Sequence, residues 1–235
     1  MATVLLLRHG LTSLTGPVLA GRTPGVHLDE RGRAQAEAAA QRIAVLPLIA
    51  IVTSPLERCA ETADAIAAAQ RAAGREPAMH IDERVIECGY GSWTGRPFKE
   101  LTRDPMWKVV QGQPSAAHFP DGEALAEVSS RAVTAVREWD ARLGAEATWL
   151  LCSHGDVIKA ILADALGLHL DQFQRIVADP CSVSIVRYTD TRPYVLLTND
   201  TGGDLAAFGR AVKRRRGRRQ QHDAAVGGGS GSGAT

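Results

Sequence analysis

Residues 4–10 read Val-Leu-Leu-Leu-Arg-His-Gly, a short apolar run that ends abruptly in a cation, an imidazole and a glycine. Such a run, closed by a turn residue, is typical of a buried strand in a parallel sheet. Proteins of the α/β class bind their ligands at the carboxyl ends of these strands. Arg8 supplies a permanent positive charge, His9 a nucleophile or general base, and Gly10 close backbone approach. The stretch therefore predicts a parallel sheet with a site for an anionic substrate.

Similar apolar runs predict four further strands, at residues 48–52, 149–152, 183–186 and 194–197. Helical patterns occupy residues 30–45, 55–73, 121–143 and 156–166. Ser54 is expected to cap the second of these helices, with Pro55 at its first position, and Gly167 to end the last. Strands that alternate with helices predict a three-layer α-β-α fold around a mostly parallel sheet. The last two strands, joined by residues 189–193, predict an antiparallel hairpin at the edge of the sheet.

The chain has 235 residues, of which 45% are hydrophobic and 23% charged, as in ordinary globular proteins. One domain is expected over residues 1–205, with the Gly- and Pro-rich segment 84–120 as an insertion that covers the substrate. The four cysteines form no C-x-x-C pair and are expected to be buried free thiols. No run is long enough to cross a bilayer, and the apolar start is too short for a signal peptide. We therefore expect a cytoplasmic protein without a membrane partner.

Residues 206–235 form a segment of different composition, basic at first and then rich in Gly and Ser. Seven Lys and Arg stand against one acidic residue in positions 210–235, while the rest of the chain is net negative. This composition predicts a disordered tail. The acidic body argues against nucleic acid as the main partner, although a basic tail that touches nucleic acid or an anionic surface remains an alternative.

Side chains suited to phosphate follow three of the predicted strands. Arg8 and His9 end the first strand, Arg58 stands in the helix after the second, and His154 and Gly155 follow the third. Because parallel strands end at one edge of a sheet, these residues are expected to converge there, beside helix N-termini that favour anions. Metal binding is the rival interpretation of the two histidines, but no third ligand stands at helical spacing and no H-E-x-x-H motif occurs. We expect neither a metal nor a cofactor.

Five motifs occur along the chain in an order that matches a known family. They are Leu-Leu-Arg8-His9-Gly10-x-Thr12, Thr53-Ser54-Pro55-Leu56-x-Arg58, Glu87-Cys88-Gly89-Tyr90-Gly91-Ser92-Trp93-Thr94-Gly95, Phe119-Pro120-Asp121-Gly122-Glu123 and Ser153-His154-Gly155. Together they resemble the histidine phosphatase superfamily, in its phosphoglycerate mutase-like branch, over roughly residues 3–200. The segments around Trp107 and Gln174 resemble an actinobacterial subgroup described as probable phosphomutases.

The resemblance implies a mechanism and the residues that perform it. His9 would attack phosphorus in line and become phosphohistidine. Arg8, Arg58 and His154 would hold the phosphate oxygens through the transition state. Glu87 would protonate the leaving alkoxide and then activate the water that hydrolyses the phosphohistidine.

Two further substrate contacts are expected at Thr12 and Gly155. Both Glu83 and Glu87 are candidates for the acid, and the family spacing, with the carboxylate four residues before Gly91, favours Glu87. The chain departs from the family pattern at Thr15, where asparagine is frequent, which puts a phosphate contact there in doubt. Cys88-Gly89 and Ala124 also replace more usual residues near the site.

The leading prediction is a metal-independent phosphomonoester hydrolase for a small phosphorylated metabolite. The alternative is a phosphoglycerate-type phosphomutase that uses the same phosphohistidine. A binding module without catalysis is disfavoured because binding requires neither His9 nor Glu87. Residues 84–120 are expected to determine which substrate binds. Four side chains of this segment could line the pocket, but packing is the preferred interpretation of each: Trp93, Phe98, Trp107 and His118.

Overall fold

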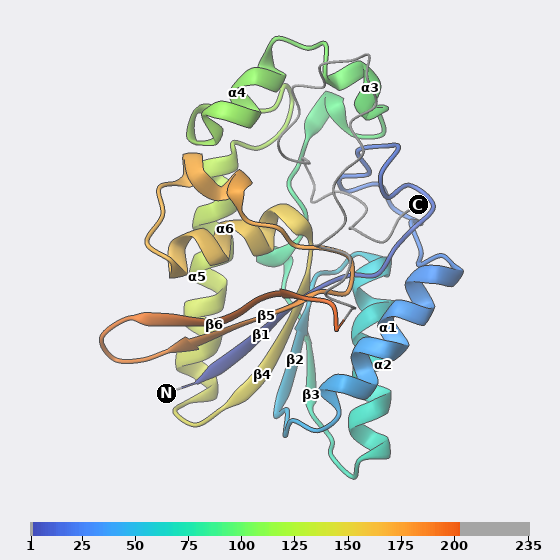
Figure 1. Ribbon diagram of the computed structural model, residues 1–235, viewed down its shortest axis with the longest axis vertical. Helices are drawn as coiled ribbons and strands as arrows, with labels where there is room; N and C mark the ends of the chain where they lie inside the picture. The colour runs from blue at the N-terminus through green and yellow to red at the C-terminus, as the bar shows by residue number, and fades with distance from the viewer. Residues whose placement is uncertain (1, 203–235) are drawn as a thin grey trace, which may run out of the picture.

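The computed structural model describes residues 2–202, which form one six-stranded sheet with helices on both faces (Figure 1). The strand order is β3-β2-β4-β1-β5-β6. Strands β1 to β4 are mutually parallel where they pair, whereas β5 pairs antiparallel with β1 and β6. The strands are β1 (Thr3–Arg8), β2 (Ala50–Thr53), β3 (Ala78–Ile81), β4 (Thr148–Ser153), β5 (Val183–Tyr188) and β6 (Pro193–Asp200).

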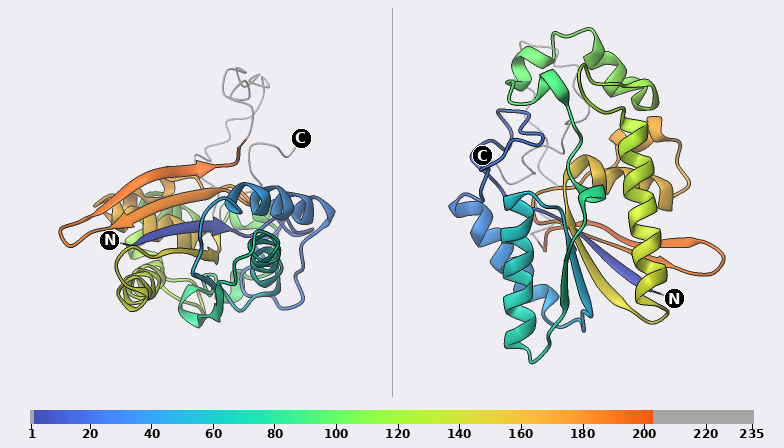
Figure 2. Two further views of the ribbon diagram at one scale, coloured as in Figure 1. Left: turned by 90° about the horizontal axis from the view of Figure 1, so that it is seen from below. Right: turned by 180° about the vertical axis from the view of Figure 1, so that it is seen from behind.

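The two faces of the sheet carry separate apolar cores, because side chains alternate along each strand. Leu5 and Leu7 of β1 pack in the core with α1 (Glu30–Ile43) and α2 (Glu57–Ala72). Val4 and Leu6 pack in the other core with α5 (Leu125–Leu143) and α6 (Gly155–Ala165). Figure 2 shows these layers from two further directions. The predicted three-layer fold, with a mostly parallel sheet and an antiparallel edge, is confirmed.

The register of the parallel strands brings their carboxyl ends to one edge. Arg8 of β1 pairs with Ser153 of β4, and Thr53 of β2 pairs with Cys152. Beyond this edge lie short helices (Figure 1). They are η1 (Glu83–Val85), η2 (Gly91–Trp93), α3 (Phe98–Leu101), α4 (Met106–Gly112), η3 (Pro114–Ala116) and η4 (Leu170–Arg175). Segment 84–120 is therefore built from short helices and turns next to the ends of the strands.

Two predicted helix starts were wrong. Helix α2 begins at Glu57, with extended Leu56 as its N-cap, so Ser54 does not cap it and Pro55 is outside it. The hydroxyl of Ser54 lies instead 2.7 Å from Nε2 of His154. Helix α5 begins at Leu125 and not at Asp121, which has the left-handed φ of 58° in a tight turn.

Strand β3 was missed because the sequence pattern gives little sign of it. Its four side chains are exposed or half-buried, so it has no apolar run. The end of α6 was predicted correctly. Gly167 has a φ of 67°, its N–H donates to Asp164, and the N–H of Leu168 donates to Ala163, as in a Schellman cap. The terminal hairpin between β5 and β6 is confirmed as well.

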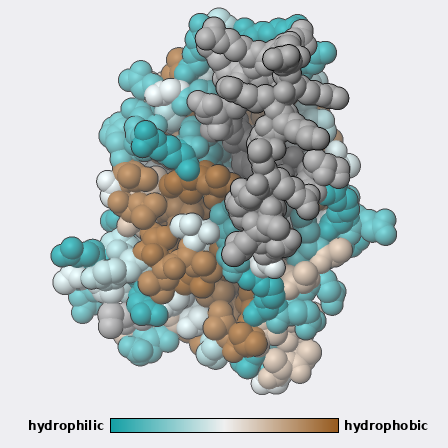
Figure 3. Space-filling model, in the orientation of Figure 1, coloured by the Kyte–Doolittle hydropathy of each residue, from teal (hydrophilic) through white to brown (hydrophobic). Residues whose placement is uncertain are grey.

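All four cysteines are free and buried, as expected: Cys59, Cys88, Cys152 and Cys181. Within residues 2–202, no helix is both long and apolar enough to cross a membrane. Apolar side chains stay exposed on β6 and after α6 and η4, where Figure 3 shows a hydrophobic surface: Leu166, Leu168, Val177, Tyr194 and Leu196. The predicted tail at 206–235, with its alternative nucleic-acid contact, lies outside the described residues.

Candidate active site

His9 follows β1 directly and presents a neutral imidazole. It is 5% exposed, and its Nδ1 lies 2.7 Å from the carbonyl oxygen of Gly10. That contact assigns the proton to Nδ1, which donates to the carbonyl, so Nε2 keeps its lone pair. Burial, followed by the charges of Arg58 and Arg8, lowers the pKa of His9 well below its usual value. The side chain is therefore in the form that a nucleophile requires.

Arg58 places a buried cation beside this nitrogen. It stands in the first turn of α2 and is 2% exposed. Its Nε donates to Nε2 of His9 at 3.3 Å, and its Nη2 donates to the carbonyl of Gly21 at 2.7 Å. Its Nη1 is buried and has no hydrogen-bond partner in the described part of the chain. Because an unpaired buried donor is unfavourable, this group indicates a place for an anion.

Arg8 brings a second buried guanidinium to the same site. Its Nη1 donates to the carbonyl of Ala178 at 2.8 Å. Burial lowers the pKa of Arg8, but an arginine stays charged in proteins. Two cations side by side favour a doubly charged ligand such as a phosphate monoester.

Glu87 is the carboxyl group of the site and is 4% exposed. Its Oε1 accepts from the backbone N–H of Cys88 at 2.9 Å. Burial, reinforced by the negative charge of Asp156, raises the pKa of Glu87 to about 7. At neutral pH the group can therefore both donate and accept a proton.

The loop that carries Glu87 is held by a carboxylate that sequence reasoning did not assign to the site. Glu123 accepts from Nη2 of Arg22 at 2.6 Å and from Nε of Arg131 at 2.9 Å. Arg22 and Arg131 also donate to the carbonyl oxygen of Glu87, at 2.8 and 3.2 Å. The motif from Phe119 to Glu123 was the available signal for these contacts. The motif marks Glu123 in the sequence but does not show that it holds the Glu87 loop.

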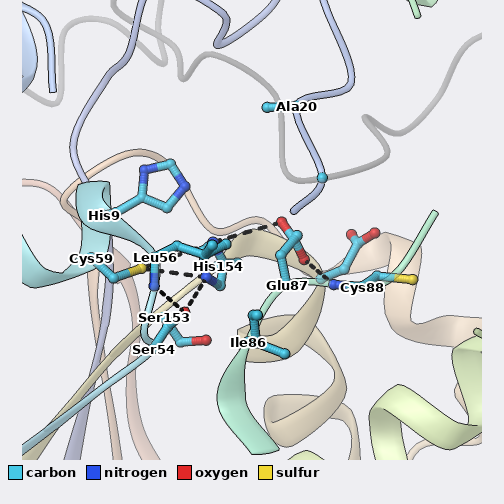
Figure 4. Close-up of polar contacts among 12 residues, drawn as sticks. His9, Ala20, Ser54, Leu56, Cys59, Ile86, Glu87, Cys88, Ser153 and His154 are labelled. Carbon is cyan, nitrogen blue, oxygen red and sulfur yellow. Dashed lines mark hydrogen bonds and ion pairs between the residues drawn. The ribbon is translucent and has the colours of Figure 1, made fainter. Parts of the chain in front are cut away.

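His154 lies behind the other residues, without exposed surface. Its Nε2 faces the hydroxyl of Ser54, and its Nδ1 lies 3.9 Å from Oε2 of Glu87 (Figure 4). The same Nδ1 lies 3.4 Å from Nη2 of Arg58. Burial, followed by the charge of Arg58, lowers the pKa of His154, so its contact with Glu87 is not that of a charged imidazolium. The ring centroids of His9 and His154 are 5.2 Å apart.

A second buried network stands behind Glu87 and was not predicted. The Tyr90 hydroxyl donates to Oδ2 of Asp156 at 2.8 Å, and Nζ of Lys159 lies 3.4 Å from Oδ1 of the same carboxylate. Asp156 and Lys159 are both buried. Asp156 follows the Ser153-His154-Gly155 motif by one position, and an acidic residue at this place in a largely apolar helix was the available signal.

These residues surround one pocket at the carboxyl edge of the sheet. Of the predicted site residues it is lined by Arg8, His9, Thr12, Arg58 and Glu87. Its remaining lining residues are Thr15, Gly16, Val18, Leu19, Ala20, Gly21, Tyr90 and Phe98.

Four residues considered from the sequence as substrate contacts have a different setting in the structure. Among the described residues, His154 and Gly155 do not line the pocket. Gly10 was expected to let the backbone approach a ligand, but a Cβ there would lie 2.6 Å from the carbonyl oxygen of Gly32, so the close neighbour is helix α1. Thr15 does line the pocket, and its hydroxyl accepts from the N–H of Thr12 at 3.0 Å, which closes the turn of this loop.

The aromatic residues of segment 84–120 divide between packing and the pocket. Trp93 and Trp107 are buried in the core and stack with centroids 6.1 Å apart, as expected for packing. His118 is exposed and contacts the carbonyl of Gly122. Phe98 is half-buried and lines the pocket, so the packing interpretation was incomplete for it.

Within residues 2–202, no group of three or more His, Cys, Asp or Glu is arranged to hold a metal ion.

Comparison with known proteins shows the family of this chain. The chain is 30% identical over 207 residues to phosphoserine phosphatase 1 of Hydrogenobacter thermophilus, covering 86% of this chain and 93% of the relative. It is 31% identical over 194 residues to the probable phosphoglycerate mutase GpmB of Yersinia pestis, covering 81% and 87%. The solved structure of Bacillus stearothermophilus YhfR superimposes with a TM-score of 0.76 at 28% identity, over 85% of this chain and 98% of that one. The model of the histidine phosphatase superfamily (branch 1) matches residues 4–201. The chain therefore belongs to branch 1 of the histidine phosphatase superfamily.

Proposed function

We propose that the protein is a metal-independent phosphomonoester hydrolase that acts on a small phosphorylated metabolite through a phosphohistidine at His9. The observation that carries this proposal is the unpaired Nη1 of Arg58, buried beside the neutral Nε2 of His9 in one pocket with Glu87. An anion that satisfies Arg58 at this place stands within reach of a nucleophile and a proton donor. The relatives named as a phosphatase and as a mutase support chemistry at a phosphate monoester.

In the first step, Nε2 of His9 attacks phosphorus and forms the N–P bond. The bond from phosphorus to the ester oxygen breaks on the opposite side, and the departing oxygen takes the proton of Glu87. The alcohol leaves neutral, and Glu87 becomes a carboxylate. Its raised pKa, about 7, means that the proton is available at neutral pH.

In the second step, the Glu87 carboxylate takes a proton from water, whose oxygen attacks the phosphohistidine. The N–P bond breaks, inorganic phosphate leaves, and His9 and Glu87 return to their starting protonation states. Both steps use one carboxyl group in opposite roles, which requires a pKa near the working pH.

Arg8 and Arg58 would stabilise the charge on the non-bridging oxygens during both steps. A guanidinium about 4 Å from a unit charge contributes about 4 kcal/mol at an effective dielectric constant of 20, before desolvation. Both guanidinia are buried and held by backbone carbonyls, so little reorganisation is needed when the substrate arrives.

We further propose that His154 positions Arg58 and Glu87, since it lies close to both and outside the pocket lining. Its contact with a phosphate oxygen, and that of Gly155, stay predictions. Thr12 is proposed as a hydroxyl donor to the substrate because it lines the pocket. The four buried free thiols support the predicted cytoplasmic location, which belongs to the proposal.

Hydrolysis and phosphomutase chemistry share the first step and differ in what accepts the phosphoryl group. We expect p-nitrophenyl phosphate, with 3-phosphoglycerate added as an acceptor, to give inorganic phosphate in equal amount to p-nitrophenol, once the phosphate released from 3-phosphoglycerate alone is subtracted. The products are measured by absorbance, phosphate assay and ³¹P NMR. The same reaction without 3-phosphoglycerate is the control. Nitrophenol in excess of phosphate, with a bisphosphoglycerate as the balancing product, would overturn hydrolysis in favour of the mutase.

A further inference from the structure

Two segments far apart in the sequence, residues 17–19 and 95–98, form the outer wall of the pocket. The loop at residues 17–19 pairs with residues 95–98. The N–H of Leu19 donates to the carbonyl of Arg96 at 3.0 Å, and the N–H of Gly95 donates to the carbonyl of Leu19 at 2.8 Å. The N–H of Phe98 donates to Pro17 at 3.2 Å. These backbone hydrogen bonds hold the side chains of the wall in fixed relation to the phosphate end of the pocket.

The side chains that this wall presents are apolar. Val18, Leu19, Ala20 and Phe98 line the pocket away from the strand ends. Leu19 is buried, whereas Val18, Ala20 and Phe98 are half-buried and keep surface for a ligand. A leaving group with an apolar face can therefore displace water from this wall.

The charged side chains of the pocket are all at its phosphate end. Among the described residues, those that line it are Arg8, Arg58 and Glu87, besides His9. Three cations near this wall do not line the pocket: Arg22, Arg96 and Lys99. The guanidinium of Arg22 is bonded to Glu123 and to the carbonyl of Glu87, and Nε of Arg96 lies 3.7 Å from Glu100. Arg8 and Arg58 face the phosphate, and Glu87 must be protonated to release the alcohol. A second ionic group on the substrate therefore finds no charged partner among the described residues that line the wall side of the pocket.

We propose, building on the proposed function, that the substrates are phosphate monoesters of uncharged alcohols that carry an apolar face. An ammonium or carboxylate on the alcohol would lose water against Val18 and Phe98 without gaining an opposite charge, which is unfavourable. The alcohols of phosphoserine and 3-phosphoglycerate carry such groups. Among the described lining residues, Thr12 and Thr15 have hydroxyls, 2.9 Å apart, that can contact a neutral alcohol, whereas the hydroxyl of Tyr90 is bonded to Asp156.

The test compares substrates that differ in charge and keep the same reacting oxygen. One pair is 3-phosphoglycerate and its methyl ester, and the other is O-phosphoserine and N-acetyl-O-phosphoserine methyl ester. We expect kcat/KM to be higher for the neutral member of each pair by about tenfold or more, because its alcohol is not desolvated as an ion. Inorganic phosphate release is measured for all four, with p-nitrophenyl phosphate as the reference.

Two variants and one control test whether the apolar wall causes the preference for the neutral esters. Val18→Lys supplies the missing cation and should narrow the preference for the methyl ester of 3-phosphoglycerate over the acid by about tenfold. Val45→Lys makes the same exchange at a residue that is 78% exposed and outside the pocket, and should leave the preference as it is. Phe98→Ala should raise KM for the neutral esters more than for the acids, since it removes apolar surface that only the neutral alcohols use.

The outcomes separate this inference from the function on which it rests. Hydrolysis of p-nitrophenyl phosphate without a preference for the neutral esters, or an equal effect of Val18→Lys and Val45→Lys, overturns the inference and leaves the hydrolase standing. Absence of phosphate release from every monoester, p-nitrophenyl phosphate included, overturns the proposed function itself.

Discussion

His9 and Glu87 are buried in the same pocket, and burial moves their pKa values in opposite directions. Loss of water disfavours the charged form of each group, so the pKa of His9 falls and that of Glu87 rises to about 7. The arginines add to the effect on His9, and Asp156 adds to the effect on Glu87. At neutral pH one buried environment thus provides a free lone pair and a transferable proton.

The pH dependence of the reaction should report Glu87. Phosphorylation of His9 requires the protonated acid, so kcat/KM is expected to fall as pH rises through about 7. Hydrolysis of the phosphohistidine requires the carboxylate, so its rate is expected to fall as pH decreases. Rapid-quench kinetics measure the two steps separately. Parallel pH profiles for both steps would contradict a single carboxyl group acting in both.

The substitution Asp156→Asn tests whether the pKa of Glu87 sets this pH dependence. It removes the negative charge that raises the pKa of Glu87 and can still accept the hydroxyl proton of Tyr90, so the fall in kcat/KM should move to lower pH. Asp164→Asn, on the same helix but paired at the surface with Arg137, is the matched control and should not move it. A profile that stays in place in Asp156→Asn would show that Asp156 does not set this pKa.

At the scale of elements, the site depends on a loop crossing that brings Glu87 beneath the turn at residues 119–123. Gly91 has a φ of 52°, and a Cβ there would lie 1.9 Å from the carbonyl oxygen of Pro120. The N–H of Glu123 donates to Gly89 at 2.7 Å, and its carboxylate accepts from the N–H of the same glycine at 2.8 Å. The position of Glu87, the proposed acid, therefore relies on the absence of a side chain at Gly91.

Gly91→Ala should reduce both stability and activity, because it adds backbone strain and a steric collision. Gly95→Ala is the control that adds the backbone strain without the collision. Gly95 has a φ of 80° with nothing within 4 Å of its added Cβ, so its substitution adds backbone strain alone, about 1 kcal/mol. Gly91→Ala adds the collision with Pro120 and is expected to lower the free energy of unfolding by about 3 kcal/mol or more. Urea denaturation measures both. Equal losses in the two variants would show that the crossing tolerates a side chain.

Most elements were predictable because their sequence pattern and their burial agree. Strands β1 and β4 are continuous apolar runs buried on both faces. Strand β3 is not, because an edge strand with exposed side chains has no such pattern. The start of α2 was misplaced because Ser54, a good cap by local rules, bonds to His154, which is 100 residues away. Local propensity could not reveal that competition.

At the scale of the whole molecule, the parallel sheet assembles the site. Arg8 and His9 end β1, Arg58 follows β2, and His154 follows β4, so their convergence could be predicted from strand order and direction alone. The residues that support them could not. Glu123 and Asp156 reach the loop of Glu87 through tertiary contacts over 34 to 66 residues, and the sequence motifs beside them do not show these contacts.

Phosphate binding should stabilise the whole fold through Arg58. A ligand at 100 times its Kd stabilises the native state by about 2.7 kcal/mol, which appears as a higher Tm. Arg58→Met removes the unpaired Nη1 and should lose most of this shift with inorganic phosphate. Arg71→Met, at the exposed end of the same helix, is the control and should keep it. An undiminished shift in Arg58→Met would place the anion elsewhere.

Trapping of the phosphoenzyme tests the central claim, that His9 accepts the phosphoryl group. Wild-type protein is mixed with ³²P-labelled phosphate monoester, quenched in base within milliseconds and separated from free label. We predict a protein-bound phosphate that is stable in base, is lost in acid, and is absent from His9→Ala, whose folding is checked by circular dichroism. A full yield of labelled protein in His9→Ala, or a label that survives acid, would contradict the account.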